Sequence, residues 1–428
     1  MKYFHILIKK VKNDEIKTVV KNFISLSSLN LFSFIFPLIL IPYLTSSIGT
    51  ELYGKYVFSF SIFNYCLLLI NFGFDYSATR LISINRKNKA IVSEIVSNVT
   101  FIRLFFAFVA SIILLLLFLI FPNISNNKLL YLFGFGILWG QAFTPLWLFQ
   151  GMEKMGYITV INLLTKLIST VLIVLFIKNA ANYYYINLFH SVSYMFSGVA
   201  SMVLISRYLK IKFVLPSFKK IKFYLNDSYH IFLSTLSMSF YREANIIILG
   251  LTTNYSMVGQ YAAIEKVIKA MQSLMEPLSK ALFPFFGRKL NSPDGSSASF
   301  IKFGKIYGLL LLLLMLTLYF VGPYLLIWYL GASFISAIIL FQILLPVIFF
   351  GGLNYYYGII GLINLGFNKY FSRAVFFTGV FSVSACYLLS SYYGSIGAAI
   401  AMTSSEIILL FLILLKITSW RKNQINLK

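Results

Sequence analysis

The chain has 428 residues, of which 59% are hydrophobic and only 11% are charged. A mean hydropathy of +0.84 excludes a soluble globular domain. The formal net charge is +24, but the basic residues fall in the connectors between apolar segments. That placement is typical of membrane proteins and argues against nucleic-acid binding.

Apolar segments of membrane-spanning length recur along the whole chain, and each should be helical because a lipid-exposed backbone must satisfy its own hydrogen bonds. In the first half, spans are predicted at 22–44, 53–74, 99–121, 129–150, 156–177 and 184–206. In the second half, they are predicted at 229–252, 257–285, 301–326, 333–358, 371–390 and 394–417. The sequence therefore predicts an all-α polytopic membrane protein with about twelve transmembrane helices.

The connectors also predict an orientation. Of the 36 Lys and Arg residues, the segments that would face outward hold only Lys55, Lys128 and Lys178, if both termini are cytoplasmic. Cytoplasmic connectors carry an excess of Lys and Arg, so we expect both termini inside the cell.

A basic cytoplasmic linker divides the chain into two halves. The predicted parts are a basic N-terminal segment, a first lobe, the linker, a second lobe and a cytoplasmic tail, at 1–21, 22–206, 207–228, 229–417 and 418–428. The linker has two interpretations: a segment held against anionic lipid, or a docking surface for a lipid-linked substrate.

A faint repeat relates the two halves. Gly54 and Tyr56 match Gly259 and Tyr261 at an offset of 205. Such an offset predicts a parallel six-plus-six repeat, and repeats of this kind place the substrate at the interface between halves.

The most unusual feature is a row of charges in the eighth predicted span. Lys266, Lys269, Glu276 and Lys280 fall on one face of a helix over 257–285, and Arg242 lies within the seventh span. Buried cations are costly in a bilayer and usually face a water-filled path. We interpret them as the lining of a cavity for an anionic cargo.

An alternative interpretation is that the row is self-neutralised. Glu265 with Lys269, and Glu276 with Lys280, are pairs four residues apart in the favourable order, whereas Lys266 has no such partner within its helix. Ser239 and Asn30 are candidate hydrogen-bonding groups of the same cavity. Five charged residues are candidates for ion pairing or for coupling to a proton or sodium gradient: Glu243, Glu265, Glu276, Glu406 and Lys166. Arg103, near the start of the third span, is expected to extend its head group toward the membrane surface.

The sequence gives no sign of an enzyme. We find no phosphate-binding glycine loop, no nucleophile constellation and no metal-ligand spacing among Cys66, Cys386 and the three histidines. No catalytic residue, metal or cofactor is therefore expected.

Several motifs resemble those of one family. The segment 22–86 contains Pro42-Tyr43-Leu44, Tyr53-Gly54 and Phe72-Gly73-Phe74, and PLWLFQGMEKM follows at 145–155. With SFYREANIIILGL, which begins at Ser239, these segments resemble Wzx-type O-antigen flippases of the polysaccharide transporter family. The sequence departs from the family at Thr45-Ser46-Ser47, where members often carry an arginine.

The resemblance implies two pseudo-symmetric six-helix lobes around a central cavity, in a MATE-like arrangement, with Asp75 and Arg80 at the cytoplasmic mouth. It implies that an undecaprenyl-pyrophosphate-linked oligosaccharide is flipped by alternating access from the cytoplasmic to the periplasmic leaflet of the bacterial inner membrane. Membrane lipid, a glycan polymerase and a chain-length regulator are the further partners expected. Two alternatives remain open: an ion-coupled multidrug exporter of the same fold, and a membrane glycan polymerase.

Overall fold

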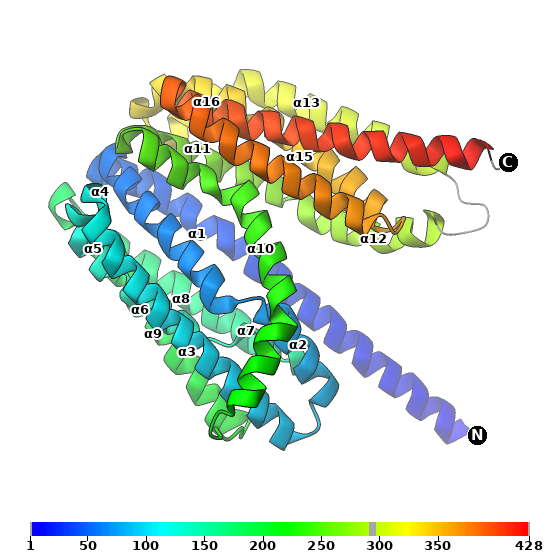
Figure 1. Ribbon diagram of the computed structural model, residues 1–428. Coiled ribbons are helices and arrows are strands. Elements are labelled where there is room, and N and C mark those ends of the chain that lie inside the picture. Colours follow the sequence, from blue (N-terminus) through cyan, green and yellow to red (C-terminus); the bar gives the residue numbers. More distant parts are fainter. Residues whose placement is uncertain (1, 291–296, 427–428) are drawn as a thin grey trace. The chain divides into compact units, whose positions relative to one another are not determined.

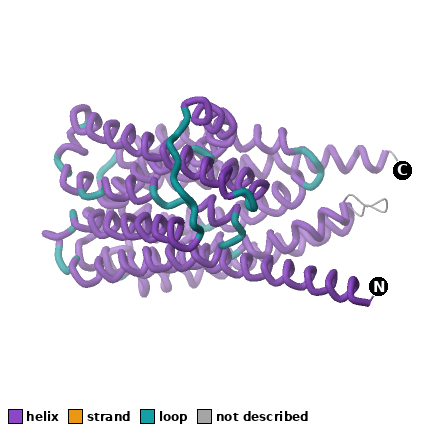
Figure 2. The backbone as a smooth tube through the Cα atoms, turned by 90° about the horizontal axis from the view of Figure 1, so that it is seen from below, coloured by secondary structure: helices purple, strands orange, loops and turns teal. Residues whose placement is uncertain are grey.

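The computed structural model describes the backbone of residues 2–290 and 297–426, which consists of helices and short connections (Figures 1 and 2). Side chains are described at these positions except 2–34, 123, 241–242, 276–281, 284, 297–298 and 422–426. Within the described backbone there is no β-strand. The prediction of an all-α polytopic membrane protein is confirmed.

The chain forms two compact units by their internal packing. The first contains residues 1–40 and 62–236, and the second contains residues 41–61 and 237–428. Two long helices, α1 (Lys2–Asn71) and α10 (Phe218–Thr252), each contribute residues to both units. The lobe boundaries expected from the sequence stay a prediction.

The first unit is built from parts of α1 and α10 and from the helices between them. These are α2 (Phe74–Asn85), α3 (Lys89–Ile120), α4 (Pro122–Ser125), α5 (Lys128–Leu132), α6 (Phe135–Ala142), α7 (Leu146–Gly151), α8 (Met155–Phe176), the short helix η1 (Ala180–Asn182), α9 (Tyr185–Val203) and η2 (Leu204–Tyr208). Its hydrophobic core joins α2, α3 and α7 around Phe74, Val96 and Trp147. The fourth predicted span, 129–150, is interrupted between α6 and α7 at Pro145, because proline cannot continue a helical hydrogen-bond ladder.

The second unit contains the rest of the helices. These are α11 (Tyr255–Ser273), α12 (Met275–Leu290), α13 (Ser297–Leu330), η3 (Ala332–Ala337), α14 (Ile338–Leu344), α15 (Pro346–Asn354), η4 (Tyr355–Ile363) and α16 (Asn368–Asn426). An aromatic core joins α12, α13 and η4, where the rings of Phe300 and Tyr356 stack 4.8 Å apart.

Consecutive spans are joined at glycines. Gly49 (φ 80°) interrupts α1 and Gly394 (φ 58°) interrupts α16, so each of these helices contains two of the predicted spans. Positive φ is strained for residues with a Cβ atom, which explains glycine at both positions.

Eight stretches of the described chain are long and apolar enough to cross a membrane. Two of them, Ile35–Asn85 and Asn368–Arg421, each hold two predicted spans. The predicted seventh and eighth spans coincide with α10 and α11 but fall outside these stretches, because their charged residues lower the mean hydropathy. In helix α10 only Glu243–Thr252 forms a shorter apolar stretch.

The eighth span differs from the prediction in one respect. Instead of one helix over 257–285, the structure has α11 and α12 separated at Leu274. Pro277 lacks the N–H that would bond to the carbonyl group of Ser273, and this loss favours a break. Glu276 and Lys280 therefore belong to α12, whereas Lys266 and Lys269 belong to α11, and a shared face for the four charges stays a prediction.

Candidate functional site

Helix α11 carries the candidate cations, and its position is fixed by close packing. It begins at Asn254, whose side-chain oxygen accepts a hydrogen bond from the Met257 amide at 3.0 Å. Its small residues Gly259, Ala262 and Ala263 face inward, and Ala262 is 3% exposed. Small side chains let neighbouring helices approach closely, so this helix lies in direct contact with others of the second unit.

Glu265 lies at the centre of a buried polar network. It is 2% exposed, and its Oε1 lies 3.2 Å from Lys269 Nζ and 3.3 Å from Tyr261 Oη. The Nδ2 group of Asn245 on α10 donates to Tyr261 Oη at 3.1 Å. The pair of Glu265 and Lys269, four residues apart, thus forms as the sequence spacing suggests, and the carboxylate holds Lys269 toward the packed interior.

Lys266 differs from Lys269 in its surroundings. It is half-buried, and among the described side chains no carboxylate oxygen lies within 4.0 Å of its Nζ. The acidic groups that act on it over a longer distance are Glu265 and the exposed Glu243 of α10. Among the described cations of α11, Lys266 is therefore the one that lies outside ion-pair distance of a carboxylate.

Several predicted cavity residues cannot be placed at the level of side chains. Asn30 belongs to α1, Arg242 to α10, and Glu276 and Lys280 to α12, but their side chains lie outside the described residues. Ser239 of α10 is described and half-buried. Ser239 and Glu243 thus lie on α10, and Glu265, Lys266 and Lys269 lie on α11, all within the second unit.

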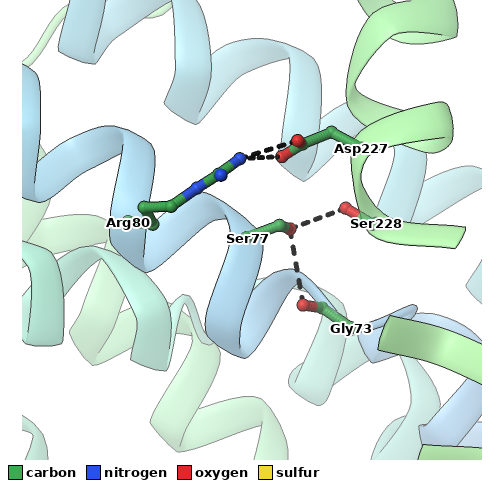
Figure 3. A network of polar contacts seen from close by, with 5 residues as sticks. All are labelled: Gly73, Ser77, Arg80, Asp227 and Ser228. Atoms are coloured by element: carbon green, nitrogen blue, oxygen red, sulfur yellow. Dashed lines mark hydrogen bonds and ion pairs between the residues drawn. The ribbon is translucent and has the colours of Figure 1, made fainter. Parts of the chain in front are cut away.

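The residues predicted at the cytoplasmic mouth lie on α2 of the first unit. Arg80 Nη2 donates to both carboxylate oxygens of Asp227, at 2.7 and 3.0 Å, and joins α2 to α10 (Figure 3). Ser77 and Ser228 form a second link one turn away, with their hydroxyl oxygens 2.6 Å apart (Figure 3). Asp75 is half-buried on the same helix. This pair of links attaches the start of α10 firmly to α2.

The two isolated intramembrane charges have different surroundings. Glu406 of α16 is 9% exposed, and Asn354 Nδ2 donates to its Oε2 at 2.7 Å and to its backbone oxygen at 3.0 Å. Lys166 of α8 is half-buried and interacts electrostatically with His190 of α9. Lys166 belongs to the first unit, and Glu406 in the second unit contacts Asn354 of α15.

Arg103 corrects one expectation and is a residue whose role the sequence did not reveal. Instead of reaching toward the membrane surface, it is 1% exposed. Its guanidinium donates to the backbone oxygens of Thr144 (2.9 Å) and Gln141 (2.6 Å) and to Asn71 Oδ1 (3.1 Å). These carbonyl groups lie where α6 ends before Pro145, so the Gln141 oxygen has no α-helical donor four residues on. Each also accepts one backbone N–H, from Thr144 at 3.0 Å and from Leu146 at 3.2 Å, and Arg103 supplies the further donor. The break in the fourth span was the available signal, because freed carbonyl groups at membrane depth require a donor.

Comparison with known proteins settles the family. Residues 19–289 match the model of the family described as polysaccharide biosynthesis protein. The chain belongs to this family. Two relatives, one from Escherichia coli (strain K12) and one from Shigella dysenteriae, both bear the description "Putative O-antigen transporter". The first is 26% identical over 92% of this chain and 95% of its own length, and the second is 25% identical over 92% and 98%.

Solved structures share the fold of this member of the polysaccharide biosynthesis family. An inward closed conformation of the lipid II flippase MurJ superimposes with a TM-score of 0.72 at 12% identity, over 94% of this chain and 87% of that one. An inward-facing multidrug resistance MATE family transporter superimposes with a TM-score of 0.64 at 13% identity, over 90% and 98%. At such identities the likeness shows the fold, which is that of a polytopic membrane protein.

Proposed function

We propose that this protein flips a lipid-linked oligosaccharide across the bacterial inner membrane, with Lys266 as the main contact for the anionic pyrophosphate. The single observation that carries the proposal is the half-buried Lys266, which has no carboxylate within ion-pair distance among the described side chains. An ionisable residue within a membrane-spanning helix is a functional candidate by default, and a phosphate group is a natural partner of a lysine point charge.

The relatives support the cargo and the class of activity. Both are described as O-antigen transporters, and this chain matches almost their whole lengths, which favours a transporter over an enzyme. An undecaprenyl-pyrophosphate-linked repeat unit, moved from the cytoplasmic to the periplasmic leaflet by alternating access, fits these descriptions. The basic connectors support cytoplasmic termini and the inner membrane. A glycan polymerase and a chain-length regulator would act on the product, and a proton or sodium gradient would supply the energy.

The two alternatives receive less support. An exporter of cationic drugs needs an acidic cavity. On α11, by contrast, the charged residue that forms no ion pair with a described side chain is the basic Lys266. A glycan polymerase needs a sizeable external loop for its acceptor, and the predicted outward connectors are short.

Replacing Lys266 by Gln should strongly reduce the export of the glycan. Loss of a hydrogen bond to a charged group costs about 1.5–3 kcal/mol, which weakens cargo binding roughly ten- to a hundred-fold. The measurement is the surface O-antigen of a strain that lacks its own transporter and carries the variant. Lys269→Gln should have a smaller effect, because Glu265 already occupies its ammonium group.

The control variant is Lys302→Gln, which removes one exposed positive charge from α13 and should leave export unchanged. Protein abundance in the membrane must be equal for all three variants. Normal lipopolysaccharide ladders from Lys266→Gln at normal abundance would contradict the assignment of Lys266.

A further inference from the structure

The linker between η2 and α10 forms a surface of the first unit that is both basic and apolar. We call residues 207–223 the basic collar. It begins at the end of Tyr185–Tyr208, a stretch long and apolar enough to cross a membrane, which places the collar next to a membrane boundary. The collar is a separate feature from the candidate cations on α11, which belong to the second unit.

The collar is a fixed structure rather than a loose tether. The Val214 amide donates to Ser97 Oγ at 2.9 Å, and the Ser217 amide donates to Asn98 Oδ1 at 3.0 Å. Both acceptors are buried side chains of α3, and Asn98 is 1% exposed. Leu209 and Ile211 are buried in the core of the first unit. These contacts determine which side chains of the collar point outward.

The outward side chains are of two kinds. Leu215 is 94% exposed and Phe218 is 85% exposed, although both are strongly apolar. All the basic residues of the collar are exposed as well: Arg207, Lys210, Lys212, Lys219, Lys220 and Lys222. Among the described side chains only Lys220 forms an ion pair, with Glu94 at 2.9 Å. The collar thus holds large apolar groups in the midst of exposed positive charge.

We propose that the basic collar docks in the headgroup layer of the cytoplasmic leaflet, where Leu215 and Phe218 enter the acyl boundary and the lysines bind anionic phospholipid. Apolar side chains flanked by Lys are the pattern that binds anionic membrane surfaces. Protein–protein interfaces, by contrast, are depleted in Lys, which disfavours a protein partner on this surface. The proposal does not depend on the identity of the transported cargo.

Depth-dependent fluorescence quenching tests this contact in the full-length protein. Leu215→Trp introduces a probe at the most exposed collar position, and the signal of the 4 native tryptophans is subtracted with the unsubstituted protein. The protein is reconstituted in phosphatidylcholine vesicles with and without phosphatidylglycerol, and lipids brominated on their acyl chains serve as quenchers. We expect stronger quenching of the introduced tryptophan in the vesicles that contain phosphatidylglycerol.

Two variants with the same change in net charge distinguish binding by the collar from the overall electrostatic attraction between the basic protein and anionic lipid. The collar variant carries Lys210→Gln, Lys212→Gln, Lys219→Gln and Lys222→Gln, and leaves the Lys220 ion pair intact. The control variant carries Lys87→Gln, Lys89→Gln, Lys302→Gln and Lys305→Gln at exposed positions elsewhere. The collar variant should lose the effect of phosphatidylglycerol, and the control variant should keep it.

Three results would overturn the proposal. The first is equal quenching with and without phosphatidylglycerol, and the second is equal behaviour of the two charge variants. The third is a tryptophan that is open to aqueous acrylamide in reconstituted vesicles but shielded in native membranes, which would assign the surface to a protein partner.

Discussion

Replacing Arg103 by Met is expected to destabilise the first unit by about 1.5–3 kcal/mol, because it removes the only charged donor from a buried cluster of described acceptors. The side chain is 1% exposed and donates to the carbonyl groups of Gln141 and Thr144 where the fourth span is interrupted. Asn71 would also lose a donor, although Gln141 Nε2 still donates to it at 3.1 Å. The measurement is thermal unfolding of the purified protein in detergent, together with its abundance in membranes.

Arg80→Met is the matched control for this prediction. It removes the same chemical group, but the Arg80 side chain is 60% exposed and its ion pair with Asp227 lies near solvent (Figure 3). Exposed ion pairs contribute about 0–1 kcal/mol. The two variants should therefore differ clearly in unfolding temperature. Equal and small losses would show that the Arg103 contacts do not stabilise the interrupted span.

Replacing Gly54 by Ala should also be strongly destabilising, because there is no room for a side chain at this position. A Cβ atom on Gly54 would lie 1.8 Å from the carbonyl oxygen of Tyr255, and a Cβ on Gly259 would lie 2.1 Å from that of Thr50. The obstacles are backbone atoms, which cannot rotate away as a side chain could. Forced overpacking costs about 1–3 kcal/mol and occasionally more. We expect a lower unfolding temperature for Gly54→Ala and for Gly259→Ala.

The double variant gives a sharper test. Both substitutions push apart the same two helical segments, so the loss of stability in Gly54→Ala/Gly259→Ala should be smaller than the sum of the single losses. Gly156→Ala on α8 is the control, since a Cβ there meets nothing within 4 Å and no loss is expected. Single variants as stable as Gly156→Ala would contradict the close crossing.

The same crossing explains the faint sequence repeat. At this crossing Gly54 contacts the backbone of Tyr255, and Gly259 contacts the backbone of Thr50. In the sequence repeat, Gly54 corresponds to Gly259 and Thr50 corresponds to Tyr255, each at an offset of 205. The two contacts are therefore equivalent under exchange of the repeats, which is the property of an isologous contact. A hydrogen-bond contact between Thr50 Oγ1 and Ser256 Oγ, 3.4 Å apart, accompanies it.

The sequence by itself determined the class of the protein, the approximate positions of its spans and the ion pair within α11. Hydropathy and the placement of Lys and Arg are local properties of a segment, so they could be read without the fold. The spacing of Glu265 and Lys269 likewise depends only on helical geometry, and their ion pair forms. Even the glycines of the close crossing were visible as a repeat, although their contact was not.

Only the tertiary structure decided which polar groups meet across the fold. The partners of Arg103 lie 32 to 41 positions away in the chain. Ser97 and Asn98 of α3 bond to residues of the basic collar that lie more than a hundred positions away. No local pattern encodes such pairings, because they depend on how distant helices pack. The break at Leu274 likewise places Lys266 on α11 with Glu265 and Lys269, and Glu276 and Lys280 on α12. Among the described side chains of α11, packing pairs Lys269 with Glu265 and leaves Lys266 outside ion-pair distance of a carboxylate.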